Sequence, residues 1–377
     1  MLDTLRDNPE VLWGFLLALA VVLLLTPGVG RFARFLGVVD EPGETRRVHL
    51  RPVPRLGGIA LLLGIFVPAL AFLPLDGPYR GILLGAAIAT TVGAIDDFRG
   101  LPWWGKLGGQ LAAAGVAIGF GVTVERFTFP GFGSQELPEW VGGPATIVWI
   151  VAIMNMVNFL DGMDGLAAGI CAIAGSTFAV IGLSLGEADA ALLSAIVAGA
   201  CFGFLHHNFY PARIFMGDSG ALLLGFLLAT VSVQGLVKTA ALATLVLPLL
   251  VLAIPIIDTS FVVAKRMKYR QPLYEADRKH LHHRFMNIGF SQPRAVVYMY
   301  LWCGILAAAA LSTRFLPPRP RGDWDISNAL VAGLVGLAAL FASLYIAYLL
   351  EIVKLANPRI RRREERARRD RAERRSA

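Results

Sequence analysis

The chain contains 377 residues, of which 56% are hydrophobic and only 16% are charged, and its mean hydropathy is +0.61. Soluble globular proteins carry about 25% charged residues, so this composition excludes an ordinary water-soluble enzyme. The formal net charge of +8 requires no nucleic-acid partner, because basic residues that face anionic lipid account for it.

Long apolar runs alternate with short polar segments along the chain. Several runs reach the roughly 20 residues that a helix needs to cross about 30 Å of hydrocarbon. Backbone groups within a bilayer must pair inside their own segment, so these runs are predicted to be helices. The predicted fold class is therefore an all-α, polytopic membrane protein. Its eleven predicted spans cover residues 11–30, 57–75, 80–95, 106–122, 143–157, 166–184, 189–206, 220–236, 240–263, 295–314 and 328–350.

The positions of Lys and Arg predict which ends of the spans face the cytoplasm. With the N-terminus outside, the inner segments contain 28 of the 35 basic residues and the outer segments contain seven. The C-terminus is then cytoplasmic, and the polar residues that can carry chemistry lie almost entirely on the inner side. We predict one membrane domain over residues 1–356 and a solvated basic tail over residues 357–377.

The first inner segment, residues 39–58, is rich in basic residues: Arg46, Arg47, His49, Arg51 and Arg55. The inner-face bias explains most of this charge, while substrate binding by Arg46 and His49 is the functional alternative. Gly57 and Gly58 open the next predicted span and would allow backbones to pack closely.

Two adjacent acids, Asp96 and Asp97, follow the third predicted span. Carboxylates at the edge of hydrocarbon are costly unless they are paired, hydrated or bound to a cation. Neighbouring side chains on a helix point about 100° apart, so both acids can face one site only where the helix ends. Gly100 and Pro102 predict that end. We expect metal ligation or proton acceptance here, and two solvated loop acids are the alternative.

Four polar residues recur at every third position between two later apolar runs: Asn155, Asn158, Asp161 and Asp164. This spacing drifts by about 60° per step on a straight helix, so the four would not share one face. Gly162 and Gly165 predict that the helix breaks, which would let the polar groups surround a ligand. Such oxygen donors suit Mg²⁺ or Mn²⁺, whereas helix capping is the structural alternative.

The next inner segment, residues 206–220, ends where another span begins. Asp218 follows Gly217 at this predicted helix N-terminus, where an acid can hold a metal while backbone N–H groups meet phosphate. A simple helix cap is the alternative for Asp218. Four more residues of this segment are candidate substrate-binding residues: Asn208, Arg213, Phe215 and Gly217.

The longest inner loop contains a dense cluster of hydrogen-bond donors: His280, His282, His283 and Arg284. Flanking cations make this cluster a better site for anionic phosphates than for zinc. A solvated basic loop beside anionic lipid is the structural alternative.

Four of these segments, taken in chain order, resemble the polyprenyl-phosphate N-acetylhexosamine-1-phosphate transferase family. They are the Asp96–Asp97 pair, the polar run 155–164, the segment 206–220 and the histidine loop 280–284. The resemblance covers roughly residues 30–300. It implies a membrane enzyme of ten or eleven helices, with Mg²⁺ as cofactor and an active site in a cytoplasmic cleft. By position, Asp96 and Asp97 match the family's acid pair, one of which is proposed to take the proton of a lipid phosphate. Asn158, Asp161 and Asp218 match the residues nearest Mg²⁺.

The same resemblance implies the substrate. Asn155 and Asp164 match supporting polar positions and are candidate substrate-binding residues, and the histidines of the 280–283 loop match a phosphate-binding motif. Leu281 interrupts these histidines, and the segment that starts at Val39 reads Val-Asp-Glu-Pro. Both features resemble the undecaprenyl-phosphate N-acetylglucosamine-1-phosphate transferase branch. Phospho-N-acetylmuramoyl-pentapeptide transferase is the alternative.

The resemblance implies that UDP-N-acetylglucosamine and undecaprenyl phosphate, or a similar polyprenyl phosphate, are the substrates. UMP would be released, and the product would start a cell-envelope glycan at the bacterial inner membrane. Mn²⁺ is an alternative to Mg²⁺, no nucleic acid is expected as a partner, and a homodimer is among the open oligomeric states. An ion-coupled transporter is the distant alternative, but its acids should lie in the middle of spans rather than at their inner ends.

Overall fold

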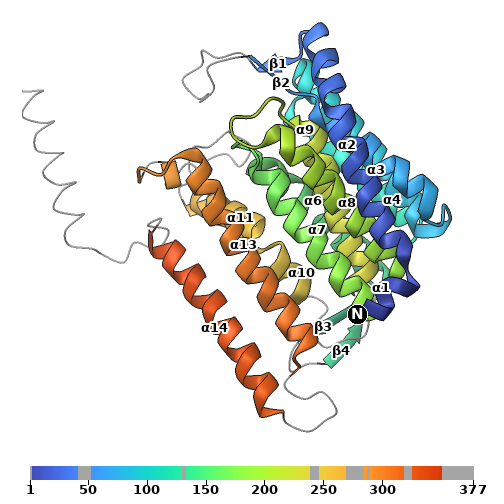
Figure 1. Ribbon diagram of the computed structural model, residues 1–377. Helices are drawn as coiled ribbons and strands as arrows, with labels where there is room; N and C mark the ends of the chain where they lie inside the picture. The colour runs from blue at the N-terminus through green and yellow to red at the C-terminus, as the bar shows by residue number, and fades with distance from the viewer. Residues whose placement is uncertain are drawn as a thin grey trace, which may run out of the picture.

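The computed structural model describes residues 2–40, 52–129, 133–237, 246–268, 284–286, 288–317 and 325–349. Most of these residues are helical (Figure 1). The first half contains α1 (Leu2–Asp7), α2 (Pro9–Phe35), β1 (Val39–Asp40), β2 (Val53–Pro54), α3 (Gly57–Phe72), α4 (Gly77–Arg99), α5 (Trp103–Gly119), β3 (Arg126–Phe129) and β4 (Gly133–Glu136). The second half contains α6 (Glu139–Leu160), α7 (Leu166–Leu185), α8 (Ala188–Asn208), α9 (Gly217–Val231), the π-helix η1 (Ser232–Val237), α10 (Val246–Val251), α11 (Ala253–Lys268), α13 (Gln292–Phe315) and α14 (Ile326–Leu349).

Eight of the described helices are long and apolar enough to cross a membrane, and Gly57–Phe72 is a shorter apolar helix. The predicted polytopic, helical architecture is confirmed, while the count of eleven spans and the N-outside orientation stay predictions. The span predicted over residues 240–263 forms two helices in its described part. Pro255 has no N–H for the carbonyl of Val251, so one regular helix cannot continue through this region.

Helix α9 lies at the centre of the bundle and packs against α3, α4 and α6. Every residue of α9 is buried except Asp218. An apolar helix of this kind is stabilised by the side chains around it, so its one partly exposed acid is held in a rigid setting. Helices α7 and α8 pack on each other, and α2 covers α8. Helix α14 lies at the periphery beside α13 (Figure 1).

Two short antiparallel hairpins mark opposite ends of the bundle (Figure 1). β1 pairs with β2, with Val39 opposite Pro54, at the end where α2 stops. β3 pairs with β4 near the N-terminus of the chain, with Arg126 opposite Glu136. The spans predicted from the sequence put the loops that contain these two strand pairs on opposite sides of the membrane, and the described strands lie at opposite ends of the bundle.

Candidate active site

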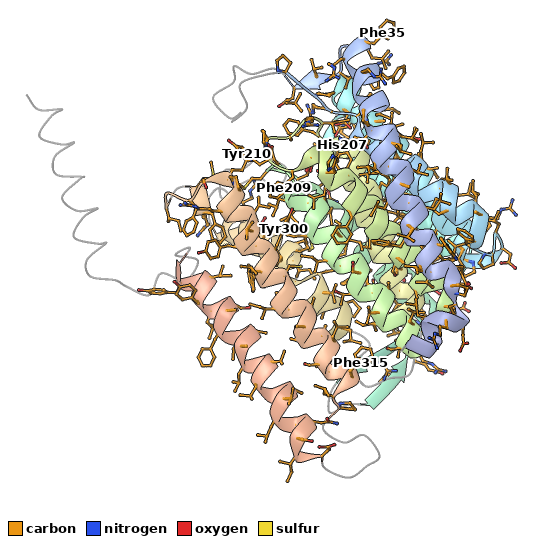
Figure 2. The ribbon with its side chains drawn as sticks, in the orientation of Figure 1. Phe35, His207, Phe209, Tyr210, Tyr300 and Phe315 are labelled. Atoms are coloured by element: carbon orange, nitrogen blue, oxygen red, sulfur yellow. The ribbon has the colours of Figure 1, made fainter. Side chains whose placement is uncertain are left out.

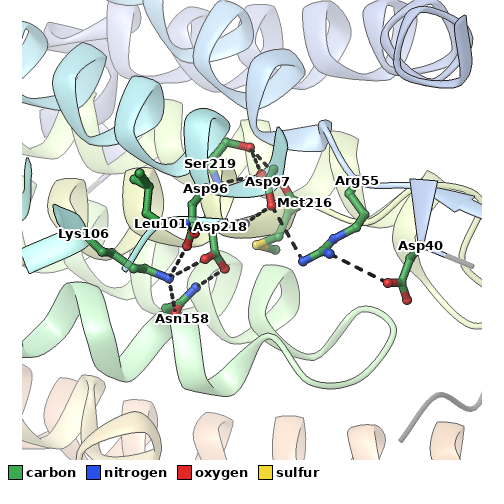
Figure 3. A network of polar contacts seen from close by, with 10 residues as sticks. All are labelled: Asp40, Arg55, Asp96, Asp97, Leu101, Lys106, Asn158, Met216, Asp218 and Ser219. Carbon is green, nitrogen blue, oxygen red and sulfur yellow. Dashed lines mark hydrogen bonds and ion pairs between the residues drawn. The ribbon is translucent and has the colours of Figure 1, made fainter. Parts of the chain in front are cut away.

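The candidate site lies where the C-terminal ends of α4 and α6 meet the N-terminal ends of α5 and α9 (Figure 3). The predicted helix end after the acid pair is confirmed, because α4 stops at Arg99 and Gly100 follows with a φ of 67°. The predicted break after Asn158 is also confirmed, since α6 ends at Leu160 and α7 begins only at Leu166. These breaks bring the polar ends of four apolar helices to one place.

Three oxygen atoms from three helices surround the ammonium group of Lys106 (Figure 3). Its Nζ atom lies 3.0 Å from Asp96 Oδ2 and 3.1 Å from Asn158 Oδ1, and it also pairs with Asp218 Oδ2. Asn158 Nδ2 donates to Asp218 Oδ1 at 2.7 Å. One cation on α5 thus connects three of the residues predicted from the sequence.

Lys106 is the functional candidate that sequence reasoning missed, because it was counted only among the basic residues of the inner face. A signal was present in the sequence. A lysine in the first turn of an apolar helix, just after Trp103 and Trp104, is costly at a membrane unless it finds a partner. The partners lie more than 50 residues away in two of three cases, so only the fold identifies them.

Asp97, the second acid of the pair, caps the N-terminus of α9. Its Oδ1 accepts a hydrogen bond from Asp218 N at 2.9 Å, and its Oδ2 accepts from Ser219 N at 3.1 Å and Ser219 Oγ at 2.9 Å. The residue before the helix, Met216, provides no such cap. A carboxylate at this position satisfies free N–H groups and interacts favourably with the helix dipole. The Asp97 side chain is 0% exposed, so it positions Asp218 from inside the protein.

The segments 54–58 and 215–220 are packed backbone against backbone. Three hydrogen bonds connect them, from Phe215 N to Pro54 O at 2.8 Å, from Gly57 N to Phe215 O at 3.0 Å and from Gly58 N to Met216 O at 2.9 Å. A side chain at Gly58 would collide with the backbone of Gly220, which confirms the close packing predicted for this glycine pair. Gly217 has a φ of 69°, and a side chain there would meet Arg55 O and Asp97 Oδ2.

Arg55 approaches the network from the side away from Lys106 (Figure 3). Its guanidinium nitrogens lie 3.9 Å from Asp97 Oδ1 and 3.8 Å from Asp40 Oδ1. The Arg55 side chain is 38% exposed. Because Lys106 lies on the other side, a cation stands at each flank of the acidic network.

Asp164 and Asn208 hold together the two loops beside the network. Asp164 Oδ2 accepts a hydrogen bond from Ala212 N at 2.9 Å. Asn208 Oδ1 accepts from Gly165 N at 3.0 Å, and Asn208 Nδ2 donates to Ile214 O at 2.9 Å. Both residues were predicted to bind substrate, and the fold gives them loop-to-loop contacts.

A buried histidine ties α2 to the same region. Pro27 lies inside α2 and leaves the carbonyl of Leu23 without the N–H that a regular helix would supply. His207 Nε2 donates to this carbonyl at 3.0 Å, and the backbone oxygen of His207 accepts from Arg213 N at 2.9 Å. Figure 2 shows His207 at the same end of the bundle as Tyr210. Nothing in the spacing of the sequence predicts this contact.

Other predicted residues support neighbouring helices or face outward. Asn155 exchanges two hydrogen bonds with Gln110, at 2.8 and 3.1 Å, which fixes α6 against α5. Tyr300 of α13, which the sequence did not single out, donates to the backbone oxygen of Gly165. Arg213 is exposed, Phe215 is half-buried, and Arg284 is half-buried in the short described segment 284–286. Five predicted residues lie outside the described residues: Arg46, His49, His280, His282 and His283.

Asp161 follows the last turn of α6, where its N–H donates to Asn158 O at 3.3 Å. Burial first, and then the negative charges of Asp218 and Asp97, raise the pKa of Asp161 to about 8. A nearby divalent cation would favour its charged form instead. Asp161 is thus set where a cation would relieve the repulsion among the acids.

Mg²⁺, which the family resemblance implies, can be tested against these side chains. Among the described residues, no group of three or more His, Cys, Asp or Glu side chains is spaced as a metal site. The donor chemistry nevertheless fits, because Asp96, Asn158 and Asp218 direct three oxygens to one cationic group, and carboxylate and amide oxygens suit Mg²⁺. The ammonium of Lys106 holds that place here.

Comparison with known proteins identifies the family. Residues 79–236, which include the acid pair, Lys106 and α9, match the family model described as glycosyl transferase family 4. A Bacillus subtilis (strain 168) protein named probable undecaprenyl-phosphate N-acetylglucosaminyl 1-phosphate transferase is 37% identical over 307 residues, which are 80% of this chain and 84% of that protein. The chain belongs to glycosyl transferase family 4.

Two further relatives show where it stands among family 4 proteins. The decaprenyl-phosphate N-acetylglucosaminephosphotransferase of Mycobacterium tuberculosis (strain CDC 1551 / Oshkosh) is 34% identical over 86% of this chain and 88% of its own. The phospho-N-acetylmuramoyl-pentapeptide-transferase of Moorella thermoacetica (strain ATCC 39073 / JCM 9320) is 31% identical over 80% of this chain and 98% of its own. The higher identity to the N-acetylglucosamine proteins supports the predicted branch.

Proposed function

We propose that this family 4 protein transfers N-acetylglucosamine 1-phosphate from UDP-N-acetylglucosamine to undecaprenyl phosphate or a similar polyprenyl phosphate. The names of relatives that are 34–37% identical over most of the chain support this reaction. The site supports it independently, because acids, an amide and a lysine gather at the ends of apolar helices. An ion-coupled transporter would need such groups in mid-span.

The proposed reaction joins two anions. An oxygen of the lipid phosphate forms a bond to the β-phosphorus of the donor, and the bond from that phosphorus to the bridging oxygen breaks, so UMP leaves. The second pKa of a phosphate monoester is about 6, so the acceptor is largely dianionic at neutral pH and can attack without losing a proton. The site must therefore supply positioning and charge neutralisation more than a strong base.

Lys106 is the side chain best placed to neutralise the donor's diphosphate. Its ammonium lies among Asp96, Asn158 and Asp218, and its side chain is 18% exposed. When bound, Mg²⁺ would withdraw charge from the diphosphate and make UMP a better leaving group. Asn158 and Asp218 would hold the ion, with Asp161 beside them.

The two adjacent acids take different parts in this proposal. Asp97 is a positioning residue, because its carboxylate is 0% exposed and already accepts three hydrogen bonds from α9. The Asp96 side chain is 13% exposed and the Asp218 side chain 25% exposed. Asp96 is therefore the member of the pair that can approach a substrate.

The single observation that carries the proposal is the convergence of Asp96, Asn158 and Asp218 on Lys106. The test is release of UMP by the purified full-length protein, given UDP-N-acetylglucosamine, polyprenyl phosphate and Mg²⁺. We expect release only when both substrates are present, and we expect Asp218→Asn to abolish it while the protein remains monodisperse. Ser176→Ala is the matched control, since Ser176 lies in α7 and bonds only within its own helix.

A competition between donors tests the proposed sugar. Equal concentrations of UDP-N-acetylglucosamine and UDP-N-acetylmuramoyl-pentapeptide are given to the same protein preparation. We expect preferential consumption of the smaller donor. Preferential consumption of the pentapeptide donor would overturn the sugar while leaving the reaction class intact.

A further inference from the structure

The guanidinium group of Arg55 makes two ion pairs within the described part of the protein, and both are long. Its contacts with Asp97 and Asp40, at 3.9 and 3.8 Å, are longer than hydrogen bonds. Asp97 does not depend on Arg55 for hydrogen bonds, because backbone and hydroxyl donors of α9 already bind both of its oxygens. Ion pairs that are long and partly exposed contribute little to stability. The guanidinium therefore retains donors for a ligand.

The backbone holds Arg55 firmly at this place. Arg55 N donates to Val38 O at 3.2 Å, and Arg55 O packs directly against Gly217. Pro54, just before Arg55, and Gly57, two residues after it, are both hydrogen-bonded to Phe215. A rigid backbone next to the start of α9 fixes the reach of the guanidinium relative to the acidic network.

The position of Arg55 indicates which of the two substrates its side chain would contact. In-line displacement at phosphorus places the attacking and leaving groups on opposite sides of the transferred phosphorus. The Lys106 side contains the oxygen donors of Asn158 and Asp218 and suits the donor's diphosphate. The opposite flank is then left for the attacking phosphate. Phe35, at the end of α2 (Figure 2), is 85% exposed and shortly precedes Val38, whose backbone oxygen accepts a hydrogen bond from Arg55, so apolar surface adjoins this flank.

We propose that Arg55 binds the phosphate group of the lipid acceptor. This assignment rests on the proposed function and specifies its acceptor subsite. The planar guanidinium can donate two parallel hydrogen bonds to a phosphate, which a lysine ammonium cannot reproduce. Arg55 would thereby hold the attacking oxygen in line with the donor, across the acidic network from Lys106.

The experiment compares full-length wild-type protein with Arg55→Ala and Arg55→Lys. Two quantities are measured, the KM for polyprenyl phosphate at saturating UDP-N-acetylglucosamine and the affinity for that donor without acceptor. Loss of a charge-assisted, bidentate contact should raise the acceptor KM about tenfold or more in Arg55→Ala, with Arg55→Lys in between. Donor affinity should stay within about twofold. Arg99→Ala removes an exposed cation from the end of α4 and should leave both quantities nearly unchanged.

The outcomes separate this inference from the proposed function. Absence of UMP release by the wild-type protein refutes the proposed function and this assignment with it. Normal wild-type activity with an unchanged acceptor KM in Arg55→Ala refutes the assignment alone, as does a loss confined to donor affinity. If Arg55→Ala does not fold, Arg55→Lys keeps the charge, and an acceptor KM equal to that of the wild type in a folded Arg55→Lys protein overturns the proposed bidentate contact.

Discussion

Single residues show most clearly how the acid pair divides its tasks. Asp97 accepts three hydrogen bonds at the start of α9, so Asp97→Asn would present an amide NH₂ where a carboxylate oxygen accepted. We expect unfolding to become easier by about 1–3 kcal/mol and turnover to fall because Asp218 is displaced. The measurements are denaturant unfolding in detergent and turnover at pH 7 and 9.

The pH dependence distinguishes positioning from proton transfer. If Asp97 only positions α9, raising the pH to 9 leaves Asp97→Asn impaired. Full recovery of activity at pH 9 would instead identify Asp97 as a proton acceptor. Ser219→Ala is the matched control: it removes the hydroxyl hydrogen bonds to Asp97 at 2.9 Å and to Met216 O at 3.2 Å, leaves both backbone hydrogen bonds to Asp97 in place, and should cost less stability.

Lys106 gives a second residue-level prediction. Lys106→Met keeps an unbranched side chain one atom shorter and leaves Asp96 and Asp218 without their cation. We expect turnover to fall about 100-fold or more, as when one charge-stabilising donor is lost. Affinity for Mg²⁺ should rise, because two carboxylates are freed for the ion. The measurements are turnover and the Mg²⁺ concentration that half-stabilises the chelator-treated protein against thermal unfolding. Normal turnover, or weaker Mg²⁺ binding, would contradict this role.

The types of the site residues could be predicted from the sequence more easily than their partners. Asp96, Asn158 and Asp218 stand at the ends of apolar runs, where polar groups cost free energy unless they have partners. Their importance could therefore be predicted from the sequence alone. Their common neighbour Lys106 resembled any other inner-face cation. The capping by Asp97 depends on α4 and α9 meeting across 121 residues of chain, which no local pattern encodes.

At the level of elements, the breaks were predictable where glycine causes them. Gly100 and Gly165 have φ angles of 67° and 77°, which glycine adopts readily and other residues rarely. Asp164 and Asn208 were not predictable as loop contacts. Spacing alone cannot say whether an acid in a loop binds a ligand or a backbone N–H of another loop.

The proline of α2 and the histidine of α8 form a pair that can be tested together. His207→Phe leaves the carbonyl of Leu23 unpaired and should destabilise the protein by about 1–3 kcal/mol. Pro27→Ala restores an N–H within α2 for that carbonyl, so His207→Phe should cost at least about 1 kcal/mol less in this background. Unfolding free energies of the two single variants and the double variant provide the measurement.

Additive effects of the two substitutions would contradict the proposed link between α2 and α8. His206→Phe is the matched control. His206 precedes His207 on the same helix but is exposed, so its replacement should change the unfolding free energy little in either background.

For the whole molecule, hydropathy predicted the helical membrane architecture because the cost of unpaired backbone groups in lipid allows little else. It could not predict the order in which helices pack, or that α9 occupies the centre. The sequence predicted that the polar site residues share one side of the membrane, and the described ones gather at one end of the bundle. The assignment of that side to the cytoplasm is a proposal that rests on the 28-to-7 division of basic residues.

Accessibility of introduced cysteines tests this orientation. The native Cys171, Cys201 and Cys303 are buried and should label little. Arg99→Cys at the end of α4 should react only from the cytoplasmic side, and Glu136→Cys in β4 only from outside. Labelling of both positions from the same side would contradict the topology, and labelling on the two reversed sides would contradict the cytoplasmic placement of the site.

The most direct test of the central claim follows the atoms that move. UDP-N-acetylglucosamine carrying one label in the β-phosphate and another in the sugar is given to the purified protein with polyprenyl phosphate and Mg²⁺. If the site transfers sugar 1-phosphate, both labels enter the lipid in a one-to-one ratio while unlabelled UMP is released, and Asp218→Asn abolishes both signals. Sugar label in the lipid without the β-phosphate, with release of UDP, would show a plain sugar transfer and contradict the account.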